Sequence, residues 1–229
     1  MHKGMSSTLK RKRTASPAGP ELTGDSDDKD NDQPEVVRPI VLVGHSLGGI
    51  VIKEAICQMC NGDEADRVNA KSIRGILFFG VPSQGMDIKS LRPMVGNQPN
   101  QSLLETLGKN SDFLLSQLQR FEASFDFGAS SVHFFFETME SPTAKQEHGT
   151  WTMSGPPTIL VGPHSATQGR YREPGGTFIH PVNCTHSEMV KFKHSDDETY
   201  GVIVDCLRQI QKESGKFMKE RFTAGNPSG

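Results

Sequence analysis

The sequence predicts an α/β domain in which a mostly parallel half-sheet of about four strands is flanked by helices and preceded by a disordered arm. From Val37 onward, apolar runs alternate with helical patterns, which is typical of a parallel sheet covered by helices. The run Val41–Gly49 predicts a strand, a sharp turn and a helix. We therefore divide the chain into an arm (1–36), a folded part (37–220) and a disordered tail (221–229).

The arm carries opposite charges in succession and offers almost nothing apolar to bury. The basic cluster Lys10–Arg13 precedes an acidic run with five aspartates between Asp25 and Asp32. We expect a disordered, solvated segment. The basic cluster also suits a nuclear-import signal or a nucleic-acid contact. The folded part has no basic pattern to support nucleic-acid binding, so this is the weaker interpretation.

The composition suits one soluble domain with a tail. The 229 residues carry a formal net charge of −2, with 34% hydrophobic and 23% charged residues. No apolar run approaches the roughly 20 residues that span a bilayer. The N-terminus lacks the apolar core of a secretory signal. We therefore expect an intracellular protein that is not secreted, cytoplasmic by default and nuclear if Lys10–Arg13 directs import.

In a reducing compartment the four cysteines are expected to be free thiols rather than disulfides. They are Cys57, Cys60, Cys184 and Cys206. The first two have redox or zinc spacing, but they fall inside a predicted helix and no second Cys or His pair accompanies them. Helix packing is the preferred interpretation, and we expect no metal site.

Short, nearly all-apolar runs predict strands that are buried on both faces. The four runs are Pro39–Val43, Gly75–Phe79, Val132–Phe136 and Thr158–Val161. Residues 141–157 and 162–181 show no clear periodicity and are expected as long loops over strand ends.

Three helices are predicted from apolar residues at helical spacing. The first begins after Ser46 and is marked by Ile50, Val51, Ile52, Ala55 and Ile56. The second follows a cap at Asn110 or Ser111 and buries Leu114, Leu118, Phe121 and Phe125. The third spans about Glu198 to Met218 and turns inward Val202, Cys206, Leu207 and Ile210.

The turn at Ser46 has the Gly-x-Ser-x-Gly pattern of a nucleophile elbow. Such a turn strains the serine backbone, lifts the hydroxyl out of the sheet and leaves the next N–H, that of Leu47, free to bind an oxyanion. Side chains at Gly44 and Gly48 are expected to collide with the neighbouring strand and helix. An ordinary strand–turn–helix is the alternative interpretation.

A nucleophilic serine needs a base to take its proton and an acid to orient that base. Glu137 closes the third predicted strand, and His186 lies shortly before the last helix. This gives the chain order Ser, acid, His that α/β-hydrolases use. The alternative bases are His164 and His180, whereas Asp196 and Asp197 follow His186 and would break the order.

These stretches resemble the serine-hydrolase domain of the serine active site-containing protein family, in the lipase/esterase-like branch of the α/β-hydrolases. The resemblance spans about residues 38–193 and is carried by residues 40–49, 75–82, 136–138 and 186–192. It implies Ser46 as nucleophile, Glu137 as acid and His186 as base. The leading hypothesis is hydrolysis of an acyl ester or thioester without a cofactor, and the apolar elbow helix and the loose covering loops favour a lipid-like acyl group.

Domains of this family open with a strand and a His-Gly oxyanion loop before the elbow, so the sequence predicts a truncated α/β-hydrolase. One of two oxyanion donors is then missing, a loss that typically costs about 10² to 10³ in rate. The acid that often follows the fourth strand is also absent, since Val161 leads to Gly162.

Two further expectations follow from the truncation. The first strand becomes an apolar edge that favours self-association or pairing with a partner chain. The alternative hypothesis for the function is a non-catalytic hydrolase remnant that acts as an interaction or regulatory module.

Overall fold

A computed structural model describes residues 37–88, 101–128, 130–170 and 178–223. The arm (1–36) and residues 224–229 lie outside the described residues, and so do the predictions made for Lys10–Arg13. Among the described residues, no helix combines the length and the apolar character that crossing a membrane requires.

Four parallel strands form the central sheet in the order β1-β2-β3-β6. They are β1 (Ile40–His45), β2 (Ile73–Phe79), β3 (Ser131–Glu137) and β6 (Ile179–Val182). The register aligns their carboxyl ends, because His45 is opposite Phe79 and Glu137 is opposite Val182. The predicted α/β architecture, a parallel four-stranded sheet between helices, is confirmed.

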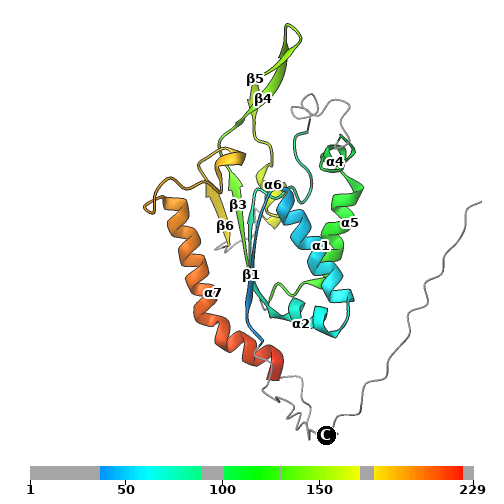
Figure 1. The fold of residues 1–229 in the computed structure, drawn as a ribbon, viewed down its shortest axis with the longest axis vertical. Coiled ribbons are helices and arrows are strands. Elements are labelled where there is room, and N and C mark those ends of the chain that lie inside the picture. Colours follow the sequence, from blue (N-terminus) through cyan, green and yellow to red (C-terminus); the bar gives the residue numbers. More distant parts are fainter. Residues whose placement is uncertain (1–36, 89–100, 129, 171–177, 224–229) are drawn as a thin grey trace, which may run out of the picture. The chain divides into compact units, whose positions relative to one another are not determined.

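Helices cover both faces of this sheet, which explains why its strands are almost continuously apolar (Figure 1). One face, with Phe78 and Phe134, packs against α1 (Leu47–Asn61) and α5 (Asp112–Ser124). The other face carries the alternate residues Leu77, Phe79 and Phe135 and packs against α7 (Glu198–Thr223).

The helices follow the predicted patterns with two differences. Ser111 caps α5 by accepting a hydrogen bond from the N–H of Leu114. Helix α7 continues to Thr223, past the predicted boundary at residue 220. Leu207 is 36% exposed, so the prediction that it points inward was wrong, although Cys206 and Ile210 are buried as expected.

The remaining helices are α2 (Glu64–Ser72), α4 (Gln101–Thr106), α6 (Pro163–Ala166) and the 3₁₀ turn η2 (His186–Glu188).

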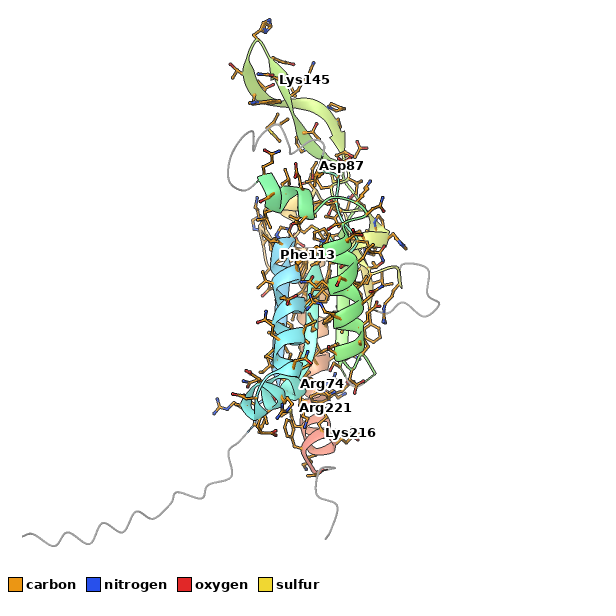
Figure 2. The ribbon with its side chains drawn as sticks, turned by 90° about the vertical axis from the view of Figure 1, so that its right-hand side faces the viewer. Arg74, Asp87, Phe113, Lys145, Lys216 and Arg221 are labelled. Atoms are coloured by element: carbon orange, nitrogen blue, oxygen red, sulfur yellow. The ribbon has the colours of Figure 1, made fainter. Side chains whose placement is uncertain are left out.

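Arg74 fastens α7 to the amino end of β2. Its guanidinium is largely buried and pairs with Glu213 of α7 at 2.6 Å. Both Arg74 and Arg221 stack on Phe217, as cations commonly do on aromatic faces. Figure 2 shows Arg74, Arg221 and Lys216 together, away from Lys145 on the hairpin formed by β4 (Ser141–Glu147) and β5 (Thr150–Thr158).

The prediction of a fourth sheet strand at Thr158–Val161 was wrong. Residues 159–161 do not join the sheet, because their backbone bonds elsewhere: Leu160 accepts from the N–H of Asp87, and Val161 donates to Glu137. The fourth strand is β6, and all of it except Val182 lies in the stretch 162–181 that was expected to be irregular. Its Pro181 is compatible with this position because β6 pairs only with β3 in the described sheet.

The stretch 141–157 is a hairpin rather than a loop. Strands β4 (Ser141–Glu147) and β5 (Thr150–Thr158) pair antiparallel. The turn is His148-Gly149, and both residues have positive φ, as the tight turns that join hairpins require. The hairpin extends beyond the carboxyl ends of the sheet strands (Figure 1).

Candidate active site

Ser46 lies on a strained turn between β1 and α1. Its φ of 50° and ψ of −123° lie in a region that non-glycine residues rarely occupy. The turn is held by the Ser46 N–H, which donates to the carbonyl of Phe79 at 2.9 Å. Strain at a single polar residue is a recurrent feature of functional sites. The hydroxyl therefore lies at the carboxyl edge of the sheet.

Two glycines, Gly44 and Gly49, allow α1 to pack closely against the sheet, whereas the sequence predicted this role for Gly44 and Gly48. A Cβ on Gly44 would lie 2.7 Å from Ile52 Cδ1 and 2.9 Å from the Gly49 backbone. A Cβ on Gly49 would overlap the side chain of Val81. The predicted collision at Gly48 was wrong, since nothing lies within 4 Å of a Cβ built there. Gly49, the next residue, provides the close contact instead.

His186 joins Ser46 to Glu137 through hydrogen bonds on its two ring nitrogens. Nε2 lies 3.0 Å from Ser46 Oγ, and Nδ1 lies 2.9 Å from Glu137 Oε2. The second carboxylate oxygen of Glu137 accepts the Val161 N–H at 2.8 Å. Glu137 is 1% exposed and His186 is 7% exposed. The structure thus brings together the three residues predicted from the sequence.

The partners of His186 define its protonation pattern. A carboxylate only accepts hydrogen bonds, so the proton on a neutral imidazole is held at Nδ1. Nε2 then carries a lone pair and accepts the O–H of Ser46. This arrangement allows Ser46 Oγ to lose its proton to Nε2 while Glu137 stabilises the resulting imidazolium.

Three further residues fix the position of His186, and none of them was assigned this role from the sequence. The His186 N–H donates to Ser141 Oγ at 3.2 Å, and its carbonyl accepts from His45 Nε2 at 3.0 Å. Burial lowers the pKa of His45, which favours the neutral ring. Gly80 has a φ of 51°, and a Cβ there would lie 2.9 Å from the ring of His186. A side chain at Gly80 would therefore displace the imidazole.

The amide of Leu47 occupies the first position of α1, next to the nucleophile. N–H groups in the first helical turn have no acceptor within their own helix. The N–H of Gly49 donates to the Ser46 carbonyl at 3.1 Å. The role of the Leu47 amide as an oxyanion donor stays a prediction, and its place at the start of α1 is compatible with it.

The ring nitrogen that bonds to Ser46 Oγ is that of His186 rather than that of either alternative base. His164 belongs to α6, and His180 contacts His133 at 3.1 Å between ring nitrogens. Asp197 accepts hydrogen bonds from the N–H groups of Thr199 and Tyr200 at the start of α7.

A buried lysine supports the elbow helix from within the core. Lys53 of α1 is 1% exposed, donates to Ser83 Oγ and lies over the rings of Phe78 and Phe121. Desolvation lowers the pKa of its amine to about 7. The folded environment therefore favours the neutral amine over the charged one.

All four cysteines are free thiols, and Cys57 and Cys60 lie within α1 as predicted.

No model of a known protein family matches this sequence, and no curated protein matches it either.

Proposed function

We propose that this chain is a serine hydrolase of the α/β-hydrolase superfamily that cleaves carboxylic esters or thioesters. The observation that carries the proposal is the hydrogen-bonded series Ser46–His186–Glu137 at the carboxyl ends of parallel strands. The strained turn at Ser46 and the chain order Ser, acid, His also support it.

In the first half of the reaction, Ser46 Oγ attacks the acyl carbonyl carbon while His186 Nε2 takes the hydroxyl proton. A new bond forms between Ser46 Oγ and the carbonyl carbon, and the carbonyl π electrons move to the carbonyl oxygen. This oxyanion accepts a hydrogen bond from the Leu47 N–H. The intermediate collapses, the bond to the leaving alkoxide or thiolate breaks, and His186 returns the proton to that group. The product of this half is an acyl ester on Ser46.

In the second half, water replaces the leaving group. His186 Nε2 takes a proton from water as its oxygen attacks the acyl carbon, and the carboxylic acid leaves when Ser46 Oγ recovers the proton. Glu137 keeps its hydrogen bond to Nδ1 throughout and stabilises the imidazolium. Its complete burial and its second bond to Val161 hold it in the orientation that this role requires.

The oxyanion donors set the expected rate. Removal of one donor typically lowers turnover about 10²- to 10³-fold. With the Leu47 amide as the donor identified beside Ser46, we expect slow hydrolysis of activated short-chain esters and thioesters. Exposed apolar residues such as Leu47, next to Ser46, support an acyl group of lipid-like character.

A non-catalytic remnant that binds a partner is the second candidate. The observation in its favour is that β1, the strand leading to Ser46, pairs only with β2 within the described sheet. Its Val43 is 58% exposed. Apolar edges of this kind are templates for pairing with another chain.

Hydrolysis of acetyl, butyryl and octanoyl p-nitrophenyl esters and thioesters tests the proposal. We expect turnover that is lost in Ser46→Ala and kept in Ser187→Ala, which removes an exposed hydroxyl beside His186. A folded chain that hydrolyses none of these substrates faster than Ser46→Ala does would contradict the proposal and favour the remnant.

A further inference from the structure

A second cluster of reactive side chains lies on the face of the sheet that α7 covers. It consists of His133 on β3, His180 on β6 and Cys206 on α7. His133 and Cys206 are buried and His180 is partly buried. Because the three residues come from separate segments, their meeting depends on the folded arrangement of both strands and the helix.

The potential ligand atoms of the cluster face one another. His133 Nδ1 lies 3.1 Å from His180 Nε2, and Cys206 Sγ lies 3.4 Å and 4.0 Å from these two nitrogens. Tetrahedral Zn²⁺ with Zn–N bonds of about 2.0–2.1 Å and a Zn–S bond of about 2.3 Å separates its ligand atoms by about 3.3–3.6 Å. The observed separations bracket those of three corners of such a tetrahedron.

The surroundings suit neutral imidazole, the form that binds metals. Burial, together with the neighbouring His180, lowers the pKa of His133 to about 4, and burial also lowers the pKa of His180. Burial raises the pKa of the Cys206 thiol, so the metal-free group is protonated. A bound cation reverses this preference, because a coordinating thiol is deprotonated outright.

Aromatic contacts hold the two imidazoles in place. The ring of His180 stacks on Phe135 at 4.6 Å between centroids, and the ring of His133 meets Phe178 edge-on at 5.1 Å. These contacts restrict the rotation of both rings.

The cluster meets open space at His180, which is partly buried, whereas His133 and Cys206 are buried. His180 lines a cavity of about 710 Å³ whose wall also includes Asp197, Glu198 and Thr199 at the start of α7. Three protein ligands beside an open space resemble zinc sites that keep an exchangeable fourth position, whereas structural sites fill all four with protein.

We propose that His133, His180 and Cys206 bind one Zn²⁺ ion, with water or a small anion from the cavity as the fourth ligand. The ion joins α7 to β3 and β6. This site is separate from Ser46 and is independent of the hydrolase proposal. Imidazole and thiolate donors favour zinc over magnesium or calcium, which prefer oxygen.

Cobalt(II) titration of the full, metal-free chain provides a direct readout, because thiolate–Co²⁺ bonding gives a charge-transfer absorption band. We expect saturation at one ion per chain, displacement by Zn²⁺ and a higher melting temperature of the zinc-loaded chain. Cys206→Ser is expected to remove the band. His180→Gln keeps the thiolate and is expected to weaken binding by at least the roughly 10- to 100-fold that loss of an outer-shell partner costs.

Two controls distinguish binding at this cluster from binding at another thiol or at Ser46. The Cys57→Ser/Cys60→Ser double variant removes the other closely spaced thiols and should keep the band. Ser46→Ala should also bind one ion, so that metal binding and hydrolase activity are judged apart. The proposal is overturned by absence of saturable binding to the folded chain, by a band that survives Cys206→Ser, or by a band lost in the double variant.

Discussion

At the residue scale, the proposed reactivity of Ser46 depends on a proton path of two hydrogen bonds. His186 accepts from Ser46 on one nitrogen and donates to Glu137 on the other. Since Glu137 also accepts the Val161 N–H, the carboxylate cannot rotate without losing a buried partner. Hydrogen bonds to the ring nitrogens of His186 and to its backbone N–H and carbonyl therefore fix the orientation of the ring together.

Glu137→Gln tests whether the carboxylate acts through the imidazole. The amide keeps the shape but removes the charge that stabilises the imidazolium, so we expect ester hydrolysis to fall by roughly 10²- to 10⁴-fold. Glu140→Gln, an exposed acid three residues away, is the matched control and should keep full activity. Equal rates for the two variants would contradict the assigned role of Glu137.

The buried amine of Lys53 should make the free energy of unfolding depend on pH. The pKa of its amine is about 7 in the folded chain and about 10.4 when unfolded, so the unfolded state holds the extra proton between these values. This group therefore makes the free energy of unfolding rise with pH from about 7 to about 10, by up to about 1.4 kcal/mol per unit. Below pH 7 its destabilising effect is fully present.

Lys53→Met isolates this contribution, because it removes the amine and keeps a long apolar chain. We expect the variant to be more stable than the parent chain at pH 6, with the difference shrinking as the pH rises toward 10. Urea denaturation at several pH values gives the comparison. A stability difference that does not change with pH would contradict the buried-amine account.

At the element scale, α1 can approach the end of β2 only because Gly49 has no side chain. A Cβ at this position would overlap Val81, whereas one at Gly48 would meet open space. Gly49→Ala is expected to lower the free energy of unfolding by about 1–3 kcal/mol through overpacking. Gly48→Ala should be neutral or stabilising by up to about 1 kcal/mol, since alanine favours helices. Urea denaturation gives the free energy of unfolding of both variants. Equal losses of stability in Gly49→Ala and Gly48→Ala would contradict the role assigned to the Val81 contact.

The elements that could be predicted are those whose burial dictates their composition. The strands β2 and β3 are rich in apolar residues because helices cover both faces, and the apolar residues of β1 are partly buried except for the exposed Val43. Strand β6 contains His180 and Pro181, and its edge position tolerates both. The run ending at Val161 is apolar because it is buried against the core, although its backbone bonds to Glu137 rather than to a strand.

At the scale of the whole molecule, the site residues could be predicted because each belongs to a local pattern. Ser46 lies in a motif, Glu137 closes an apolar strand and His186 falls in the expected chain order. The cluster of His133, His180 and Cys206 has no such pattern. Its members are far apart in the sequence, and only the packing of α7 on β3 and β6 brings them together.

The edge strand β1 makes a prediction about association in solution. Its exposed Val43 and the backbone groups along its outer side favour pairing with another chain. We expect the chain to form dimers or larger species in sedimentation velocity, and Val43→Lys to shift them toward monomer. Leu207→Lys, which alters a similarly apolar surface residue on α7, should leave the distribution unchanged. A parent chain that is monomeric at all concentrations would contradict this expectation.

The most direct test of the central claim is labelling of the folded chain with a fluorophosphonate probe, followed by mass spectrometric mapping of the modified residue. We expect a single adduct on Ser46, because the hydrogen bond to His186 Nε2 activates that hydroxyl. Labelling should disappear in Ser46→Ala, fall strongly in His186→Gln and persist in Ser187→Ala. A folded parent chain that takes up no label, or is labelled equally in Ser46→Ala, would contradict the claim that Ser46 is an activated nucleophile.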